Sequence, residues 1–156
     1  MSSPDKACTR GLWICDTERR TEEIARIAAS LAFCPAIITL SGEIGAGKTT
    51  WARSFIQHIS DVTVPSPTFT LLHSYETNLG TISHWDMYRM TNDNPIIHEF
   101  VEMLQDCITI VEWPERIPHW VNIDEYADVL SIRLCDGVAQ YAACGIWASL
   151  LKDCDM

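Results

Sequence analysis

The apolar residues of this 156-residue chain recur with two periods, one typical of buried strands and the other of amphipathic helices. Unbroken apolar or β-branched runs predict strands at residues 11–15, 36–40 and 107–111. Apolar positions three and four residues apart predict helices at residues 18–33, 48–59 and 94–104. Strands that alternate with helices are typical of an α/β fold with a partly parallel sheet.

Antiparallel pairing is predicted at two further places in the chain. The runs at 68–75 and 81–86 flank a short turn and predict a hairpin. Residues 128–133 and 139–147 predict two closing strands joined by a tight turn. Together the segments predict a single α/β domain over residues 1–156, with a central mixed sheet flanked by helices and an antiparallel β-hairpin.

A glycine-rich loop between the strand at 36–40 and the helix at 48–59 has the spacing G-x-x-x-x-G-K-[ST] of a phosphate-binding loop. Its residues are Gly42, Glu43, Ile44, Gly45, Ala46, Gly47, Lys48, Thr49 and Thr50. Glycines let backbone N–H groups approach phosphate oxygens, and the following helix directs its positive dipole end at the same anion. Lys48 would neutralise the β- and γ-phosphates, and the Thr49 hydroxyl would bind Mg²⁺. The sequence therefore predicts a P-loop NTPase-like domain that binds a nucleoside triphosphate.

An acidic residue, Glu112, directly follows the apolar strand at 107–111, as the carboxylate of a Walker B strand does. Because the carboxyl ends of parallel strands meet at one edge of the sheet, Glu112 would lie beside the phosphate loop. There it could hold Mg²⁺, directly or through water, or orient the attacking water. The alternative is an ordinary glutamate that ends a strand and faces solvent.

Composition narrows the remaining possibilities. The net charge of −10 argues against a broad nucleic-acid-binding face, so another subunit would have to hold any RNA. No apolar run approaches the 18 or so residues of a membrane span. The seven cysteines include no C-x-x-C pair and are Cys8, Cys15, Cys34, Cys107, Cys135, Cys144 and Cys154. We therefore expect reduced thiols in a cytoplasmic protein.

Three further motifs follow the phosphate loop in a fixed order. They are Ser66-Pro67-Thr68-Phe69, His84-Trp85-Asp86-Met87-Tyr88-Arg89 and Val111-Glu112-Trp113-Pro114-Glu115-Arg116. In these motifs and their order, over roughly residues 16–116, the chain resembles the TsaE family, also called YjeE. The resemblance implies a small ATPase that uses ATP and Mg²⁺ in the threonylcarbamoyl modification of adenosine in certain tRNAs. It also implies TsaD- and TsaB-like partner proteins.

The resemblance implies roles for the residues that match these motifs. The loop from Gly42 to Lys48 would hold the phosphates, and Thr50 would add a hydroxyl near the α-phosphate. Thr49 and Glu112 would be the Mg²⁺ ligands. Asp86 would complete the acidic side of the catalytic site, beside Lys48 and Glu112.

Four more nucleotide contacts are implied by the resemblance, at Glu18, Ser66, Thr68 and Trp113. Ser66 and Thr68 would form a switch-like loop near the γ-phosphate, Glu18 would lie near the base, and Trp113 would lie at the nucleotide or a partner. The residues alone leave plainer alternatives open, since a Ser-Pro pair can simply stabilise a turn. Trp113 could equally be a core or surface aromatic. Because His84 lies on a predicted strand, we expect it to pack or to form a hydrogen bond rather than to act as a catalytic base.

One feature of the family is missing from this chain. The family usually carries an arginine in its C-terminal hairpin that reaches the nucleotide, whereas this chain has Ala139-Gln140 in that region. Arg133 is the only arginine nearby. Either Arg133 or a partner residue compensates, or the base is bound more loosely.

The predicted function is a Mg²⁺-dependent ATPase that drives or resets a partner complex in tRNA modification and contacts tRNA only through that complex. Turnover by the isolated chain should be slow, because no arginine stands in a recognisable finger position. Two alternatives stay open: a small-molecule kinase, which would need an arginine-rich lid, and a non-catalytic module for which ATP is a structural ligand. The sequence has no N-K-x-D motif, which argues against a GTPase.

Overall fold

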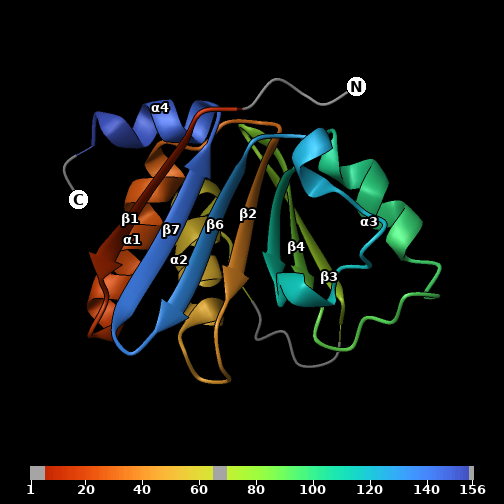
Figure 1. The fold of residues 1–156 in the computed structure, drawn as a ribbon, viewed down its shortest axis with the longest axis horizontal. Helices are drawn as coiled ribbons and strands as arrows, with labels where there is room; N and C mark the ends of the chain where they lie inside the picture. Colours follow the sequence, from red (N-terminus) through yellow and green to blue (C-terminus); the bar gives the residue numbers. More distant parts are fainter. Residues whose placement is uncertain (1–5, 65–69, 155–156) are drawn as a thin grey trace.

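The computed structural model describes residues 6–64 and 70–154, which form one seven-stranded sheet with helices on both faces (Figure 1). The elements in chain order are β1 (Cys8–Ile14), α1 (Glu18–Ser30), β2 (Ala36–Ser41), α2 (Lys48–Ser60), β3 (Leu72–Thr77), β4 (Gly80–Asp86), α3 (Ile97–Leu104), β5 (Ile108–Glu112), β6 (Val129–Cys135), β7 (Val138–Cys144) and α4 (Ile146–Lys152). Two single 3₁₀ turns, Pro114–Arg116 and Ile123–Glu125, lie between β5 and β6. None of the helices in the described ranges is long and apolar enough to cross a membrane.

The sheet is mixed, in the strand order β1-β7-β6-β2-β5-β4-β3. The four central strands β6, β2, β5 and β4 run parallel, whereas β7 and β1 at one edge and β3 at the other pair antiparallel. The predicted α/β class, mixed sheet and antiparallel hairpin are therefore confirmed. Leu40 of β2 and Asp86 of β4 both stand opposite Glu112 of β5. The carboxyl ends of these three strands therefore lie side by side.

Each face of the sheet has its own hydrophobic core. Figure 1 shows α1 and α2 behind β1, β7 and β6, and α3 on the side of β4 and β3. Ile38 and Leu40 of β2 pack with α1, α2 and α4, whereas Ile37 packs with Trp85 and Phe100 on the side of α3. Burial of β2 on both faces explains its unbroken apolar run. Because β2 is held in the core, the phosphate loop that follows it begins at a fixed place and leads directly to α2.

The C-terminal element differs from the prediction of a strand over 139–147. β7 ends at Cys144 and α4 begins at Ile146, because Gly145 has a φ of 61° and turns the chain there. A Cβ on Gly145 would collide with the carboxylate of Asp128, whose Oδ2 accepts a hydrogen bond of 2.9 Å from the Ile146 N–H. Trp147 and Leu151 of α4 are buried and lie four residues apart, as on one face of a helix. An apolar run as short as this one does not by itself distinguish a helix from a strand.

Two other predicted elements begin later than expected. The strand predicted over 68–75 is not formed at residues 70 and 71, and β3 begins at Leu72; α3 begins at Ile97 rather than at Asn94. The Asn94 side chain accepts a hydrogen bond from the Ile96 N–H. This bond gives a backbone donor just before the helix a partner outside the helix. Residues 65–69, which include Ser66 and Thr68, lie outside the described residues.

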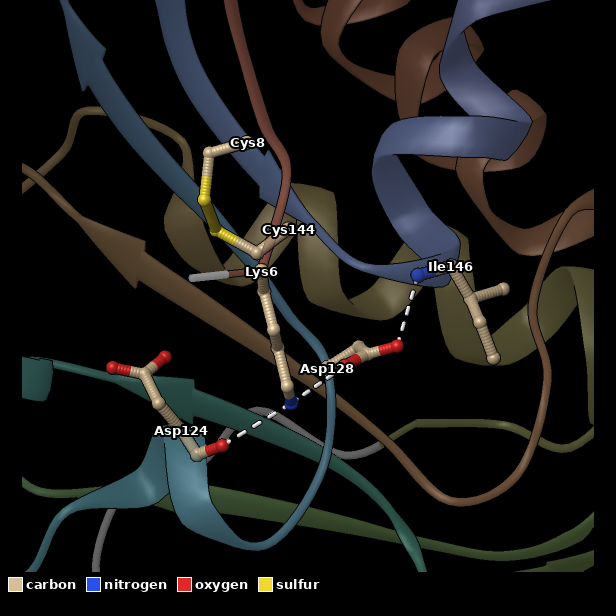
Figure 2. Close-up of a disulfide and its surroundings, with 6 residues drawn as sticks. All are labelled: Lys6, Cys8, Asp124, Asp128, Cys144 and Ile146. Carbon is tan, nitrogen blue, oxygen red and sulfur yellow. Dashed lines mark hydrogen bonds and ion pairs between the residues drawn. A yellow bond between two sulfur atoms is a disulfide. The ribbon is translucent and has the colours of Figure 1, made fainter. Parts of the chain in front are cut away.

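Two of the cysteines form a disulfide, so the prediction of seven reduced thiols is wrong for this pair. Cys8 of β1 and Cys144 of β7 stand directly opposite each other in the antiparallel register, with 4.3 Å between their Cα atoms. Figure 2 shows the bond beside an ion pair of 2.7 Å between Lys6 and Asp128. The two cysteines are 136 residues apart in the chain, and only the pairing of the first and last strands brings them together.

Candidate functional site

The phosphate loop joins the buried carboxyl end of β2 to the first residue of α2. Gly47, with a φ of 105°, caps the helix, and its carbonyl accepts a hydrogen bond of 2.9 Å from the Trp51 N–H. Gly42 has a φ of 144°, and a Cβ there would press on the carbonyl oxygen of Leu134 in β6. Glycine is therefore required at both ends of the loop, by backbone conformation at Gly47 and also by close packing at Gly42.

Lys48, at the start of α2, is buried, with 5% of its surface exposed. Its Nζ donates hydrogen bonds of 2.5 Å to the carbonyl of Gly42 and 2.8 Å to that of Glu43. Burial lowers the pKa of Lys48 below its ordinary value, and the surrounding carboxylates, Glu112 first among them, partly oppose this shift. The same Nζ lies 4.2 Å from the centre of the Trp113 ring. The ammonium group is thus held inside the loop, where phosphate oxygens would meet it.

Glu112, the last residue of β5, is the centre of the acidic side of the site. Its side chain is almost fully buried, and its Oε1 accepts a hydrogen bond of 3.0 Å from the Thr49 hydroxyl. Its Oε2 lies 2.6 Å from Nε2 of His84 on β4. The alternative of a solvent-facing glutamate at a strand end is therefore excluded. Residues 63 positions apart in the chain meet here because β2 and β5 are adjacent parallel strands.

A pocket of about 310 Å³ brings the separately predicted residues together. Its walls are formed by Ile44, Gly45, Gly47, Lys48, Thr49, Thr50, Asp86, Glu112 and Trp113. We call this the phosphate pocket. Trp113 has a left-handed backbone conformation, with a φ of 59°, which directs the chain away from β5, and its ring packs against Tyr88 with 4.9 Å between ring centres. A neighbouring hollow of about 330 Å³ shares Trp113 and is also lined by Glu43 and Arg133.

Comparison with known proteins identifies the family of this chain. The family model described as threonylcarbamoyl adenosine biosynthesis protein TsaE matches residues 15–140. This chain belongs to the TsaE family. The family takes part in the biosynthesis of threonylcarbamoyladenosine in tRNA.

Individual relatives of this TsaE-family chain cover most of its length. A tRNA threonylcarbamoyladenosine biosynthesis protein TsaE of Rickettsia felis is 36% identical over 130 residues, which are 78% of this chain and 76% of the relative. The protein of the same name from Aquifex aeolicus is 35% identical over 106 residues, 66% of this chain and 76% of the relative. The crystal structure of Bacillus subtilus YdiB aligns with a TM-score of 0.66 over 94% of this chain and 95% of that chain. At 23% identity, this last likeness concerns the fold alone.

The residues of this TsaE site suit Mg²⁺ rather than a softer metal. Thr49 and Glu112 present a hydroxyl and a carboxylate within hydrogen-bonding distance of each other, and Asp86 lies on the wall of the same pocket. Mg²⁺ prefers oxygen ligands and is commonly held by one or two protein groups together with substrate phosphates and water. Within the described ranges, no three His, Cys, Asp or Glu side chains gather into a site that could hold a metal by themselves. The donor set therefore fits a metal that arrives with the phosphates.

Not every predicted nucleotide contact lies on the phosphate pocket. Glu18 is the exposed first residue of α1 and is absent from the pocket walls, although α1 runs beside the loop, with Thr21 close to Gly47. Arg133, on β6, lines the neighbouring hollow together with Trp113 and Glu43, so an arginine lies next to the phosphate loop despite Ala139-Gln140 in the hairpin.

Sequence reasoning missed the contact between His84 and the acidic centre. Three residues of β4, Ile82, His84 and Asp86, share one face of the strand, and this alternation was visible in the sequence. The signal could have identified His84 as a neighbour of the site once Asp86 was assigned to it. What the sequence did not contain was the register of β4 against β5, which sets His84 opposite Ile110 and two residues from Glu112.

Proposed function

We propose that this protein is a Mg²⁺-dependent ATPase of the cytoplasm that drives or resets a complex of TsaD- and TsaB-like proteins in threonylcarbamoyl modification of adenosine in tRNA. The observation that supports it most strongly is the hydrogen bond of 3.0 Å between Thr49 and Glu112, next to Lys48. A hydroxyl at the start of the helix and a carboxylate from the adjacent strand are the paired metal ligands of P-loop ATPases. A loop that only capped α2 would need neither of them.

Each residue of the phosphate pocket has a part in the proposed reaction. The N–H groups of the loop and the start of α2 bind the phosphate oxygens. Lys48 exchanges its hydrogen bonds to loop carbonyls for the phosphates, and its charge stabilises the negative charge that develops during transfer. Thr49 and Glu112 hold Mg²⁺, which when bound polarises the phosphate that is attacked. Asp86 contributes the second carboxylate of the wall and orients water there.

The charge on the pocket wall supports slow turnover by the isolated protein. Among the described residues that line the phosphate pocket, Lys48 is the only cation. P-loop enzymes that lack an arginine at the γ-phosphate turn over slowly until a partner supplies one, and that contribution can amount to about 10³–10⁵-fold. Partner proteins would therefore complete the site, and tRNA would be reached only through them.

Phosphate release from ATP by the purified protein tests the proposal. We expect slow, Mg²⁺-dependent release that TsaD- and TsaB-like proteins accelerate and that Lys48→Ala abolishes. Lys152→Ala, which removes an exposed charge from the end of α4, is the matched control and should leave release unchanged. Transfer of phosphate to a small hydroxyl compound would instead support a kinase. Tight ATP binding without release, with all partners present, would support a non-catalytic module.

A further inference from the structure

His84 makes a buried contact with the proposed metal ligand. The side chain is 2% exposed, and its Nε2 lies 2.6 Å from Oε2 of Glu112, whose side chain is 4% exposed. As a Mg²⁺ ligand Glu112 would be ionised, and an ionised carboxylate has no hydrogen to donate, so Nε2–H of His84 would be the donor in this hydrogen bond. Both side chains are buried, although Glu112 also lines the phosphate pocket.

The two oxygens of Glu112 are divided between two neighbours. Oε1 accepts from the Thr49 hydroxyl, and Oε2 accepts from His84. The parallel register of β4 and β5 produces this division, since His84 stands opposite Ile110 and its ring reaches forward along the strand to Glu112. One oxygen is thus tied to the sheet and the other is directed at the start of α2.

Lys48 does not perform this task in the structure. Its Nζ donates to the carbonyls of Gly42 and Glu43 in the loop, and no hydrogen bond joins it to Glu112 among the described residues. Without His84, the buried Glu112 carboxylate would keep, among the described residues, only the Thr49 hydroxyl as a hydrogen-bond donor, so its rotamer would be poorly defined. A ligand that must be reoriented before it binds a metal binds that metal more weakly.

We propose that His84 is a positioning residue: by holding Oε2 of Glu112 it keeps Oε1 directed at Thr49 and so sets the affinity for Mg²⁺ in the ATP complex. This inference rests on the proposed function, because it takes Glu112 as a Mg²⁺ ligand. A histidine that only filled the core would affect stability but would not act selectively on the metal. The test therefore separates metal-dependent from metal-independent binding.

The experiment measures binding of a fluorescent ATP analogue by the full chain, once with Mg²⁺ and once with EDTA, and takes the ratio of the two affinities. We expect His84→Leu to lower this ratio by about 10–100-fold, the usual effect of removing a partner of a metal ligand, while binding in EDTA stays unchanged. His84→Gln, whose amide N–H can occupy the place of Nε2, should recover most of the ratio. His58→Leu is the control, because His58 is exposed in the last turn of α2 and does not line the phosphate pocket.

The outcomes distinguish failure of the positioning role of His84 from failure of the proposed function. A folded His84→Leu protein with the wild-type ratio overturns the positioning role, as does an equal loss of binding in Mg²⁺ and in EDTA. If His84→Leu does not fold by circular dichroism, His84→Asn takes its place with the same expectation, because the shorter amide does not reach Oε2. If the wild-type protein binds the ATP analogue no more tightly with Mg²⁺ than with EDTA, the proposed function is wrong. That result is obtained from the wild-type protein alone, without any His84 variant.

Discussion

Glu112→Gln should slow Mg²⁺-dependent ATP hydrolysis by about 100- to 1000-fold, as the loss of a single group that stabilises a transition state does. The substitution keeps the size of the side chain but removes the negative charge that stands 3.0 Å from the Thr49 hydroxyl. An amide oxygen is a weaker Mg²⁺ ligand than a carboxylate. The measurement is the rate of phosphate release at saturating Mg²⁺ and ATP, with circular dichroism to establish that the variant is folded.

Glu102→Gln is the control for this prediction. It removes the same charge from an exposed position on α3, on the other face of the sheet from α2, and it should release phosphate at the wild-type rate. A Glu112→Gln protein as active as wild type would mean that Glu112 is only a buried structural carboxylate. In that case another group would have to hold the metal.

Lys48→Met should abolish productive ATP binding while leaving the protein at least as stable as wild type, because it removes a charge whose burial is unfavourable. The methionine keeps the apolar stem of the side chain and removes a charge that is buried at 5% exposure. Its former partners, the carbonyls of Gly42 and Glu43, lie on a partly exposed loop where water can bind them. ATP affinity and urea unfolding, measured on the same preparation, would therefore change in opposite directions.

The stability gained by Lys48→Met should depend on pH. Burial holds the pKa of Lys48 in the folded protein below that in the unfolded chain, so the charged form costs free energy wherever both states are protonated. This cost falls as pH rises through the folded pKa and disappears above the unfolded pKa. The difference in free energy of unfolding between variant and wild type should thus be largest at neutral pH and shrink in alkaline solution. Lys152→Met removes an exposed charge from α4 and is the control for this effect. A difference in free energy of unfolding between Lys48→Met and wild type that stayed constant at all pH values would contradict this explanation.

The fold and the centre of the site were predictable because both depend on local sequence. The buried strand β2, the glycines of the loop and the start of α2 at Lys48 follow from spacing and backbone chemistry, and Glu112 follows from the apolar strand before it. Parallel strands end at a common edge, so the meeting of Glu112 with the phosphate loop needed no further information. The roles assigned to these residues stay predictions until the variants are measured.

The rest of the structure depends on contacts between distant segments. The Cys8–Cys144 bond requires β1 to pair with β7, and nothing in either strand specifies that partner. The contact of His84 with Glu112 depends on strand register, which follows from packing across the whole sheet. The turn into α4 depends on Gly145 lying against Asp128, so the apolar run before and after it appeared continuous. Local patterns carry none of these three contacts.

We propose that ATP hydrolysis at this site drives or resets the tRNA-modifying complex, and reconstitution with TsaD- and TsaB-like proteins, tRNA and the threonylcarbamoyl donor tests that claim. The measured quantity is modified adenosine formed per molecule of the TsaD-like protein. We predict many rounds with this chain and ATP, and at most one round with Lys48→Met or with a non-hydrolysable ATP analogue. Equal modification without the chain, or with the analogue in place of ATP, would contradict the claim.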